Sequence, residues 1–166
     1  MKNIISKKVI IRVVLVVLIL INCAVIFNFS SDQSDESNKK SGVIVERIVE
    51  INPKTKNLSK QEKEKKKEQI VTPIRKTAHF TVYTCLGVLL FLCAKTFDGK
   101  EKNKILVSVG LAFLYACSDE IHQHFVPGRS CELRDVCIDT CGALFGIIMV
   151  YFIARTMKKV KIKVQK

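Results

Sequence analysis

The stretch VIIRVVLVVLILINCAVIFNF, residues 9–29, decides the fold because it is an almost unbroken apolar run. Arg12 lies near its beginning and Asn22 near its end. About 20 apolar residues are needed for a helix to cross the hydrocarbon core of a bilayer. Since backbone polar groups in lipid must find their partners within the chain, we expect this segment to be a membrane-spanning helix.

Three further blocks are similar in length and composition, and polar or charged residues separate them. They span approximately residues 77–97, 105–125 and 136–154. Apolar residues make up 48% of the chain, a fraction that soluble domains can reach, so their arrangement in blocks carries the argument. The sequence therefore predicts an all-α integral membrane protein of the cell membrane, with about four transmembrane helices.

The first block could alternatively be a cleaved signal peptide, because two lysines and an arginine precede its apolar core. Residues 20–23, Leu-Ile-Asn-Cys, also faintly resemble a lipoprotein cleavage site. Asn22 does not fit that site, where a small residue is expected before the cysteine, and the apolar run continues past Cys23. A retained transmembrane anchor is the favoured interpretation.

The polar segment between the first two blocks has three parts. Residues 30–41 are rich in Ser, Asp and Asn and indicate a flexible linker. Residues 43–51 are apolar with Glu46, Arg47 and Glu50 interspersed, a spacing that does not decide between helix and strand. Ser59 is followed three residues later by Glu62, the capping-box pattern, and this predicts an external, amphipathic Lys- and Glu-rich helix leading to Pro73.

The pattern divides the chain into four parts. These are an N-terminal anchor at 1–29, a polar linker and amphipathic segment at 30–73, a three-helix membrane core at 74–155 and a basic cytoplasmic tail at 156–166. Short basic loops favour the cytoplasmic side of a membrane. The lysines between 100 and 104 and the basic tail therefore favour cytoplasmic termini, although the polar segment is equally basic. We predict that both termini are cytoplasmic.

The net charge of +13 raises the question of nucleic-acid binding, and the seven cysteines raise that of a metal or redox site. The positions of these residues favour neither. The lysines lie beside apolar blocks and no base-stacking motif accompanies them, so we expect no nucleic-acid partner. No C-x-x-C pair is present, and six cysteines lie within apolar blocks, where they are expected to pack as small side chains. Cys131 alone lies in a polar loop.

Ionisable and polar side chains gather where the second block begins, the third ends and the fourth begins, which is a single face of the membrane whatever the orientation. The candidates are Arg75, Lys76, His79, Tyr83, Asp119, Glu120, His122, Gln123, Arg129, Arg134, Asp135 and Asp139. Helical spacing places Arg75, His79 and Tyr83 on one stripe, and puts Asp139 in line with two glycines, Gly142 and Gly146, that allow close helix approach.

Two interpretations of this group remain open. The formal charges nearly cancel, so a salt-bridge network that only locks the helices together is possible. Ionisable groups at membrane depth are costly, however, and usually mark a binding or catalytic site. Arginines suit phosphate or carboxylate, while the catalytic candidates His79, Asp119, Glu120 and His122 could transfer protons. No spacing matches an established zinc motif, so no metal or other cofactor is predicted, and a divalent metal is the weaker alternative.

Several motifs in this order resemble the VanZ-like family of bacterial membrane proteins. They are Arg75-Lys76-Thr77-Ala78-His79-Phe80 with Tyr83, Asp119-Glu120-x-His122-Gln123, Pro127-Gly128-Arg129, Asp135 and Asp139-x-x-Gly142. The preceding amphipathic segment resembles the family's form in Gram-positive bacteria. Val82 departs from the family, which often has glutamate immediately before the tyrosine.

The resemblance implies a role in the cell envelope and in reduced susceptibility to teicoplanin and other lipoglycopeptides. Our hypothesis is an external polar site that binds an anionic ligand, either a phospholipid headgroup or a lipid-linked cell-wall precursor. The alternatives are an enzyme acting on a lipid phosphate or peptidoglycan precursor, and a structural or partner-binding membrane protein. Membrane lipids are the expected partners, with the precursor or a lipoglycopeptide as possible ligands.

Overall fold

The computed structural model describes residues 2–31, 34–52, 55, 59–129 and 131–164. These residues form helices and connecting turns, and no strand occurs among them. The helices are α1 (Lys2–Ser31), α2 (Ser34–Ile51), α3 (Lys60–Lys95), α4 (Glu101–His124) and α5 (Leu133–Val164). The predicted all-α class is therefore confirmed.

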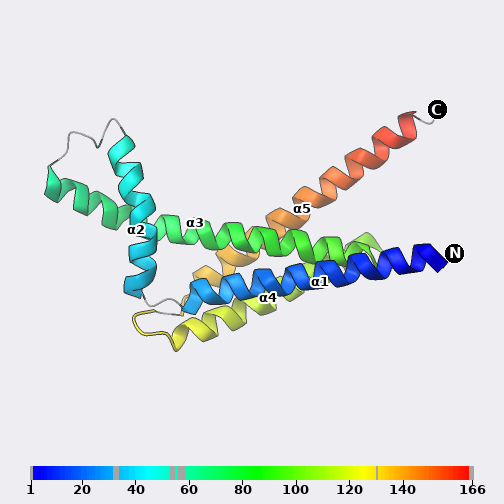
Figure 1. Ribbon diagram of the computed structural model, residues 1–166, viewed down its shortest axis with the longest axis horizontal. Helices are drawn as coiled ribbons and strands as arrows, with labels where there is room; N and C mark the ends of the chain where they lie inside the picture. Colours follow the sequence, from blue (N-terminus) through cyan, green and yellow to red (C-terminus); the bar gives the residue numbers. More distant parts are fainter. Residues whose placement is uncertain (1, 32–33, 53–54, 56–58, 130, 165–166) are drawn as a thin grey trace.

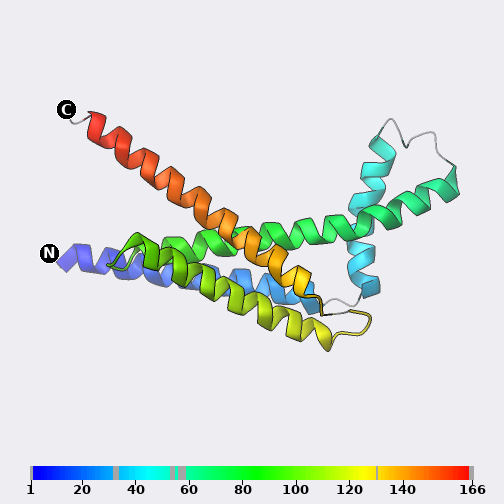
Figure 2. The same cartoon turned by 180° about the vertical axis from the view of Figure 1, so that it is seen from behind.

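Helices α1, α3, α4 and α5 are each long and apolar enough to cross a membrane, as the four apolar blocks predict. In Figure 1, α1, α3 and α4 run side by side and α5 crosses them at an angle. The amino-terminal end of α1 and the carboxy-terminal end of α5 lie at the same end of this bundle. The chain is therefore a multi-pass membrane protein, and α2 lies across the beginning of α3, beside the bundle (Figure 2).

Helix α3 begins at the predicted capping box. Glu62 N–H donates to the Ser59 hydroxyl at 3.4 Å, and the Ser59 N–H donates to Glu62 Oε2 at 2.9 Å. The helix then continues through Pro73 for 36 residues in all, about 54 Å at the usual rise per residue. Since the hydrocarbon core is about 30 Å thick, the Lys- and Glu-rich turns before Pro73 extend beyond it.

The predicted linker over residues 30–41 is wrong in most of its length. Helix α1 continues through Ser31, and α2 begins at Ser34. The undecided segment at 43–51 is helical because Val45 and Val49, one turn apart, are fully buried in packing that sequence spacing alone does not specify. The ion pair between Lys67 and Glu46 at 3.1 Å also joins α2 to α3.

Glycines bring α3 and α5 into close contact. A Cβ atom on Gly142 would lie 2.5 Å from the carbonyl oxygen of Phe80, and one on Gly146 would lie 2.3 Å from that of Thr84. The Thr84 hydroxyl donates across the interface to the Gly142 carbonyl oxygen at 3.0 Å. The close approach predicted for these two glycines is confirmed, and it places Asp139 beside α3.

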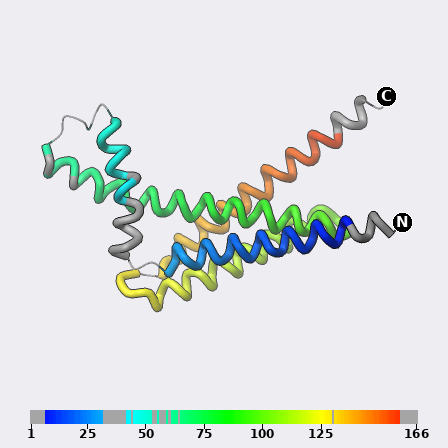
Figure 3. The backbone as a smooth tube through the Cα atoms, in the orientation of Figure 1, coloured from blue at the N-terminus to red at the C-terminus, as the bar shows by residue number. Residues whose placement is uncertain are grey.

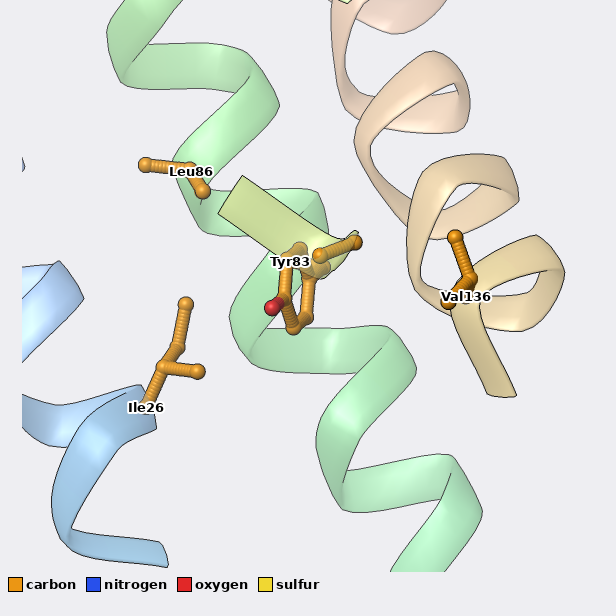
Figure 4. Packing of buried hydrophobic residues seen from close by; sticks show 5 residues of the cluster. Ile26, Tyr83, Leu86 and Val136 are labelled. Atoms are coloured by element: carbon orange, nitrogen blue, oxygen red, sulfur yellow. The ribbon is translucent and has the colours of Figure 1, made fainter. Parts of the chain in front are cut away.

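Helix α1 is packed into the bundle rather than standing apart from it. Its Ile26 is buried with Tyr83 and Leu86 of α3 and Val136 of α5 (Figure 4). Near its other end, Arg12 donates to the carbonyl oxygen of Thr96 at 2.7 Å, where α3 ends. Its remaining apolar side chains are largely exposed, as expected for a lipid-facing surface. The α4–α5 connection lies beside the carboxy-terminal end of α1 (Figure 3).

Candidate functional site

The centre of the site combines one residue from each of three helices. His79 of α3, Asp119 of α4 and Asp139 of α5 each offer a ligand atom, and these atoms all lie within 4.8 Å of one another. Asp119 and Asp139 are buried, with 4% and 1% of their surface exposed. The polar ends of the three helices therefore converge as the sequence predicts.

A narrow recess of about 20 Å³, room for roughly one water molecule, adjoins this centre, and it is partly open to solvent. Its lining is polar apart from one isoleucine. The lining residues are Arg75, Lys76, His79, Glu120, Gln123, Arg129, Asp135, Ile138 and Asp139. Most of the predicted site residues therefore surround a single cavity that carries both charge signs.

Asp119 is held by two donors from different helices. The Ser30 hydroxyl of α1 donates to Asp119 Oδ2 at 2.8 Å, and the Gln123 amide donates to the same oxygen at 3.1 Å. The Ser30 side chain is fully buried. Because both donors engage Oδ2, the orientation of this carboxylate is fixed.

Gln123 also connects the centre to the α4–α5 connection. Its side-chain oxygen accepts a hydrogen bond from Arg129 Nη1 at 2.9 Å, and Arg129 Nη2 donates to the carbonyl oxygen of Phe29 at 2.9 Å. The guanidinium thus satisfies one of the carbonyls left unpaired near the end of α1. These contacts join α1, α4 and the connection into one polar network.

Two buried oxygens at the centre have no hydrogen-bond partner within the described residues. They are Oδ2 of Asp139 and the hydroxyl of Tyr83. The closest basic atom to the former is Nδ1 of His79 at 3.8 Å, which is beyond hydrogen-bonding distance. The charged neighbours of the Tyr83 hydroxyl are Asp119 and Asp139. Orphaned polar atoms are rare in protein interiors, so this pair needs an explanation.

The rim of the recess is closed by charged pairs. Lys76 forms ion pairs with Asp135 and with Glu132, the latter at 3.3 Å. The hydrogen bond and the attraction of Lys76 hold the pKa of Glu132 below its usual range. Glu120 Oε2 accepts the backbone N–H of Glu132 at 2.9 Å, so this buried carboxylate fixes the beginning of α5.

Two predicted site residues lie away from both the centre and the recess. His122 Nε2 lies 3.0 Å from the Ser31 hydroxyl, and its ring stacks on Phe27 of α1 with centroids 4.5 Å apart. Arg134 is 70% exposed and pairs with Glu132 at 3.0 Å. The first is directed to α1 and the second to solvent, so neither contributes to the centre.

Ser30 and Glu132 belong to the site although no sequence pattern singles them out. Ser30 follows the apolar run of the first helix and resembles any serine at the end of a span. Glu132 lies in a polar loop, where acidic residues are common. Both act through partners distant in the sequence, and no local spacing indicates such partners.

All seven cysteines are free thiols, and Cys131 lies exposed in the connection beside the recess. If both termini are cytoplasmic, as the sequence predicts, the recess lies on the outer face. We expect a membrane-impermeant maleimide to label wild-type protein in intact cells and Cys131→Ser protein much less. Labelling of Cys131 only after permeabilisation would reverse the orientation.

The fold and the site together define a multi-pass membrane protein with a charged recess where its helices meet one face of the bilayer. A family model described as VanZ/LLP1 matches residues 14–155, which is most of the chain. The chain therefore belongs to the VanZ-like family. Comparison with curated proteins finds no match. No solved structure matches the chain either.

Proposed function

We propose that this protein binds an anionic group of an envelope lipid, either a phospholipid headgroup or the phosphate of a lipid-linked cell-wall precursor. The observation that carries the proposal is Arg75. Arg75 lines the recess, and its side chain makes no hydrogen bond or ion pair with the described part of the chain. Lys76 and Arg129 add positive charge to the same lining.

The position of the recess favours a lipid over a free solute. The turn of α3 that carries Arg75 lies at the junction between the Lys- and Glu-rich turns and the apolar span. Headgroups and phosphates of membrane lipids occupy this depth. A planar guanidinium can donate two parallel hydrogen bonds to phosphate or carboxylate, which makes arginine well suited to this contact.

Through such binding we propose that the protein lowers susceptibility to teicoplanin and related lipoglycopeptides at the cell envelope, in line with its family. A bound precursor or headgroup would be less accessible to the antibiotic. This proposal places the recess on the external face, with both chain termini in the cytoplasm.

The second candidate is an enzyme acting on the same lipid phosphate. The unpaired carboxylate oxygen of Asp139, with His79 3.8 Å away, favours this candidate because both groups can accept or donate a proton beside the recess. In both cases the anionic group binds first, so one experiment addresses both candidates.

Arg75→Gln is expected to weaken retention of undecaprenyl pyrophosphate about 10- to 100-fold, since a hydrogen bond to a charged group contributes about 1.5–3 kcal/mol. Native mass spectrometry of the detergent-solubilised full chain in EDTA measures retention. Undecaprenol, which lacks phosphate, controls for binding of the lipid tail. Arg134→Gln is the matched control, because Arg134 lies outside the recess.

Equal retention by wild type and Arg75→Gln would contradict the proposal and favour a purely structural role. Release of inorganic phosphate after metal is added would identify the enzyme, and an intact ligand would identify the binding protein. Expression in a teicoplanin-susceptible host tests the resistance step, where Arg75→Gln should lose any protection that wild type and Arg134→Gln provide.

A further inference from the structure

We propose that His79, Asp119 and Asp139 form a binding site for a first-row divalent cation, with Mn²⁺ as the representative ion. One imidazole nitrogen and two carboxylate oxygens converge within 4.8 Å. This mixed donor set suits Mn²⁺, Fe²⁺, Co²⁺ or Zn²⁺. The three residues come from three helices, so the spacing of an established metal motif could not have indicated them.

The unpaired oxygen of Asp139 is the independent observation that points to a cation. Asp139 is 1% exposed, and its Oδ2 has no hydrogen-bond partner within the described chain. Burying a charge without a partner is costly, and Asp119 brings a second carboxylate to the same place. Lys76 and Arg129 are engaged elsewhere, by Asp135 and Gln123 respectively. Arg75 lines the same recess but forms no ion pair with either aspartate among the described residues. A divalent cation between the carboxylates would compensate both charges.

The surroundings of Asp119 resemble the outer shell of a metal site. Ser30 and Gln123 both donate to Oδ2, which fixes the carboxylate in the orientation it would need beside an ion. The buried Tyr83 hydroxyl, whose charged neighbours are the two aspartates, is placed to hydrogen-bond a ligand held by the ion. Figure 4 shows this hydroxyl on the side of α3 that faces α1. One ion would therefore explain both orphaned oxygens.

The distances allow coordination after small side-chain rotations. Ligand bonds of about 2.1 Å place neighbouring donor atoms roughly 3–3.5 Å apart. The separations of up to 4.8 Å require the donors to close by about an ångström or more, a movement of the size that side-chain rotation provides.

The cation would lie beside Arg75, since His79 and Asp139 line the same recess. A phosphate could then place one oxygen on the ion and another on the guanidinium. This last step rests on the proposed function, whereas the metal site itself does not. The combination would prefer phosphate to a carboxylate, because phosphate offers more oxygens in divergent directions.

Mn²⁺ alone is the probe for the test, added to chelator-stripped full-length protein in detergent. Loss of the electron paramagnetic resonance signal of free Mn²⁺ measures binding. We expect one ion per wild-type chain, with affinity reduced about 100-fold or more in His79→Ala and Asp139→Asn and about 10-fold in Ser30→Ala. Asp98→Asn is the matched control, because Asp98 is an exposed carboxylate in the connection between α3 and α4.

Thermal unfolding separates a metal ligand from a structural carboxylate. In EDTA, Asp139→Asn should unfold at or above the wild-type temperature, because asparagine is isosteric and uncharged. Added Mn²⁺ should then raise the unfolding temperature of wild type and Asp98→Asn but not of Asp139→Asn. A carboxylate that only holds the fold would instead make Asp139→Asn unfold earlier in EDTA.

The proposal is overturned if wild type shows no saturable Mn²⁺ binding, or if Asp139→Asn binds Mn²⁺ as tightly as Asp98→Asn. Either result would favour a proton shared by the two aspartates. Lipid retention in EDTA without Mn²⁺ binding would contradict only the proposed metal site. Mn²⁺ binding without lipid retention would instead contradict the proposed lipid function.

Discussion

Gly87→Ala is expected to destabilise the bundle by about 3 kcal/mol or more, the upper part of the range for overpacking. A Cβ atom on Gly87 would lie 2.1 Å from the carbonyl oxygen of Ala143 and 2.7 Å from its carbonyl carbon. Both are backbone atoms, so no side-chain rotation relieves the clash. The helices α3 and α5 must separate, and this also displaces His79 from Asp139.

Gly110→Ala is the matched control for this substitution. Gly110 lies within α4, and a Cβ atom placed on it would meet no neighbouring atom within 4 Å. Alanine is favoured over glycine in a helix by about 1 kcal/mol, so this variant should be as stable as wild type or more stable. Thermal unfolding of both variants in one detergent measures the difference. Equal stability of the two variants would show that α3 and α5 leave room for a Cβ atom at Gly87.

Gln123→Leu is expected to destabilise the protein by about 2–4 kcal/mol, although leucine nearly matches glutamine in shape. It removes one donor from Asp119 and the acceptor of Arg129 Nη1, and hydrogen bonds to charged groups contribute about 1.5–3 kcal/mol each. The lost free energy of unfolding approaches that of breaking a buried charged network, because Asp119 and Arg129 both stay in place after Gln123 is replaced.

Gln69→Leu controls for the change from amide to alkyl, since Gln69 is exposed on the water-facing turns of α3. Its unfolding temperature should stay close to that of wild type. Gln123→Glu tests the mechanism further, because a carboxylate still accepts from Arg129 but repels Asp119. If Gln123→Leu were as stable as Gln69→Leu, the network joining α1 to α4 would not contribute to stability.

The four spans could be predicted because length and apolarity are properties of contiguous sequence. The start of α3 can be predicted as well, since the Ser59–Glu62 capping box is a local interaction. The sequence does not predict helix α2, because its helical register depends on the burial of Val45 and Val49 in the fold. The sequence also does not predict that α3 continues through Pro73, since proline usually kinks or ends a helix.

The candidate site was predictable as a group but not as a set of contacts. Alternating helix directions bring the ends of three spans to one face, so the cluster follows from topology. The sequence predicts His122 as a site residue, yet its ring packs on Phe27 of α1. Ser30 was missed for the same reason, because the sequence does not show which face of α4 is covered by α1.

Because α3 is one continuous helix, its water-exposed turns are rigidly connected to the recess. The water-exposed turns after Lys60 and the turn that carries Arg75 and His79 belong to one helix, whereas Asp119 and Asp139 belong to others. Any tilt of α3 about its glycine contacts with α5 would therefore move His79 relative to the two aspartates and change the shape of the recess.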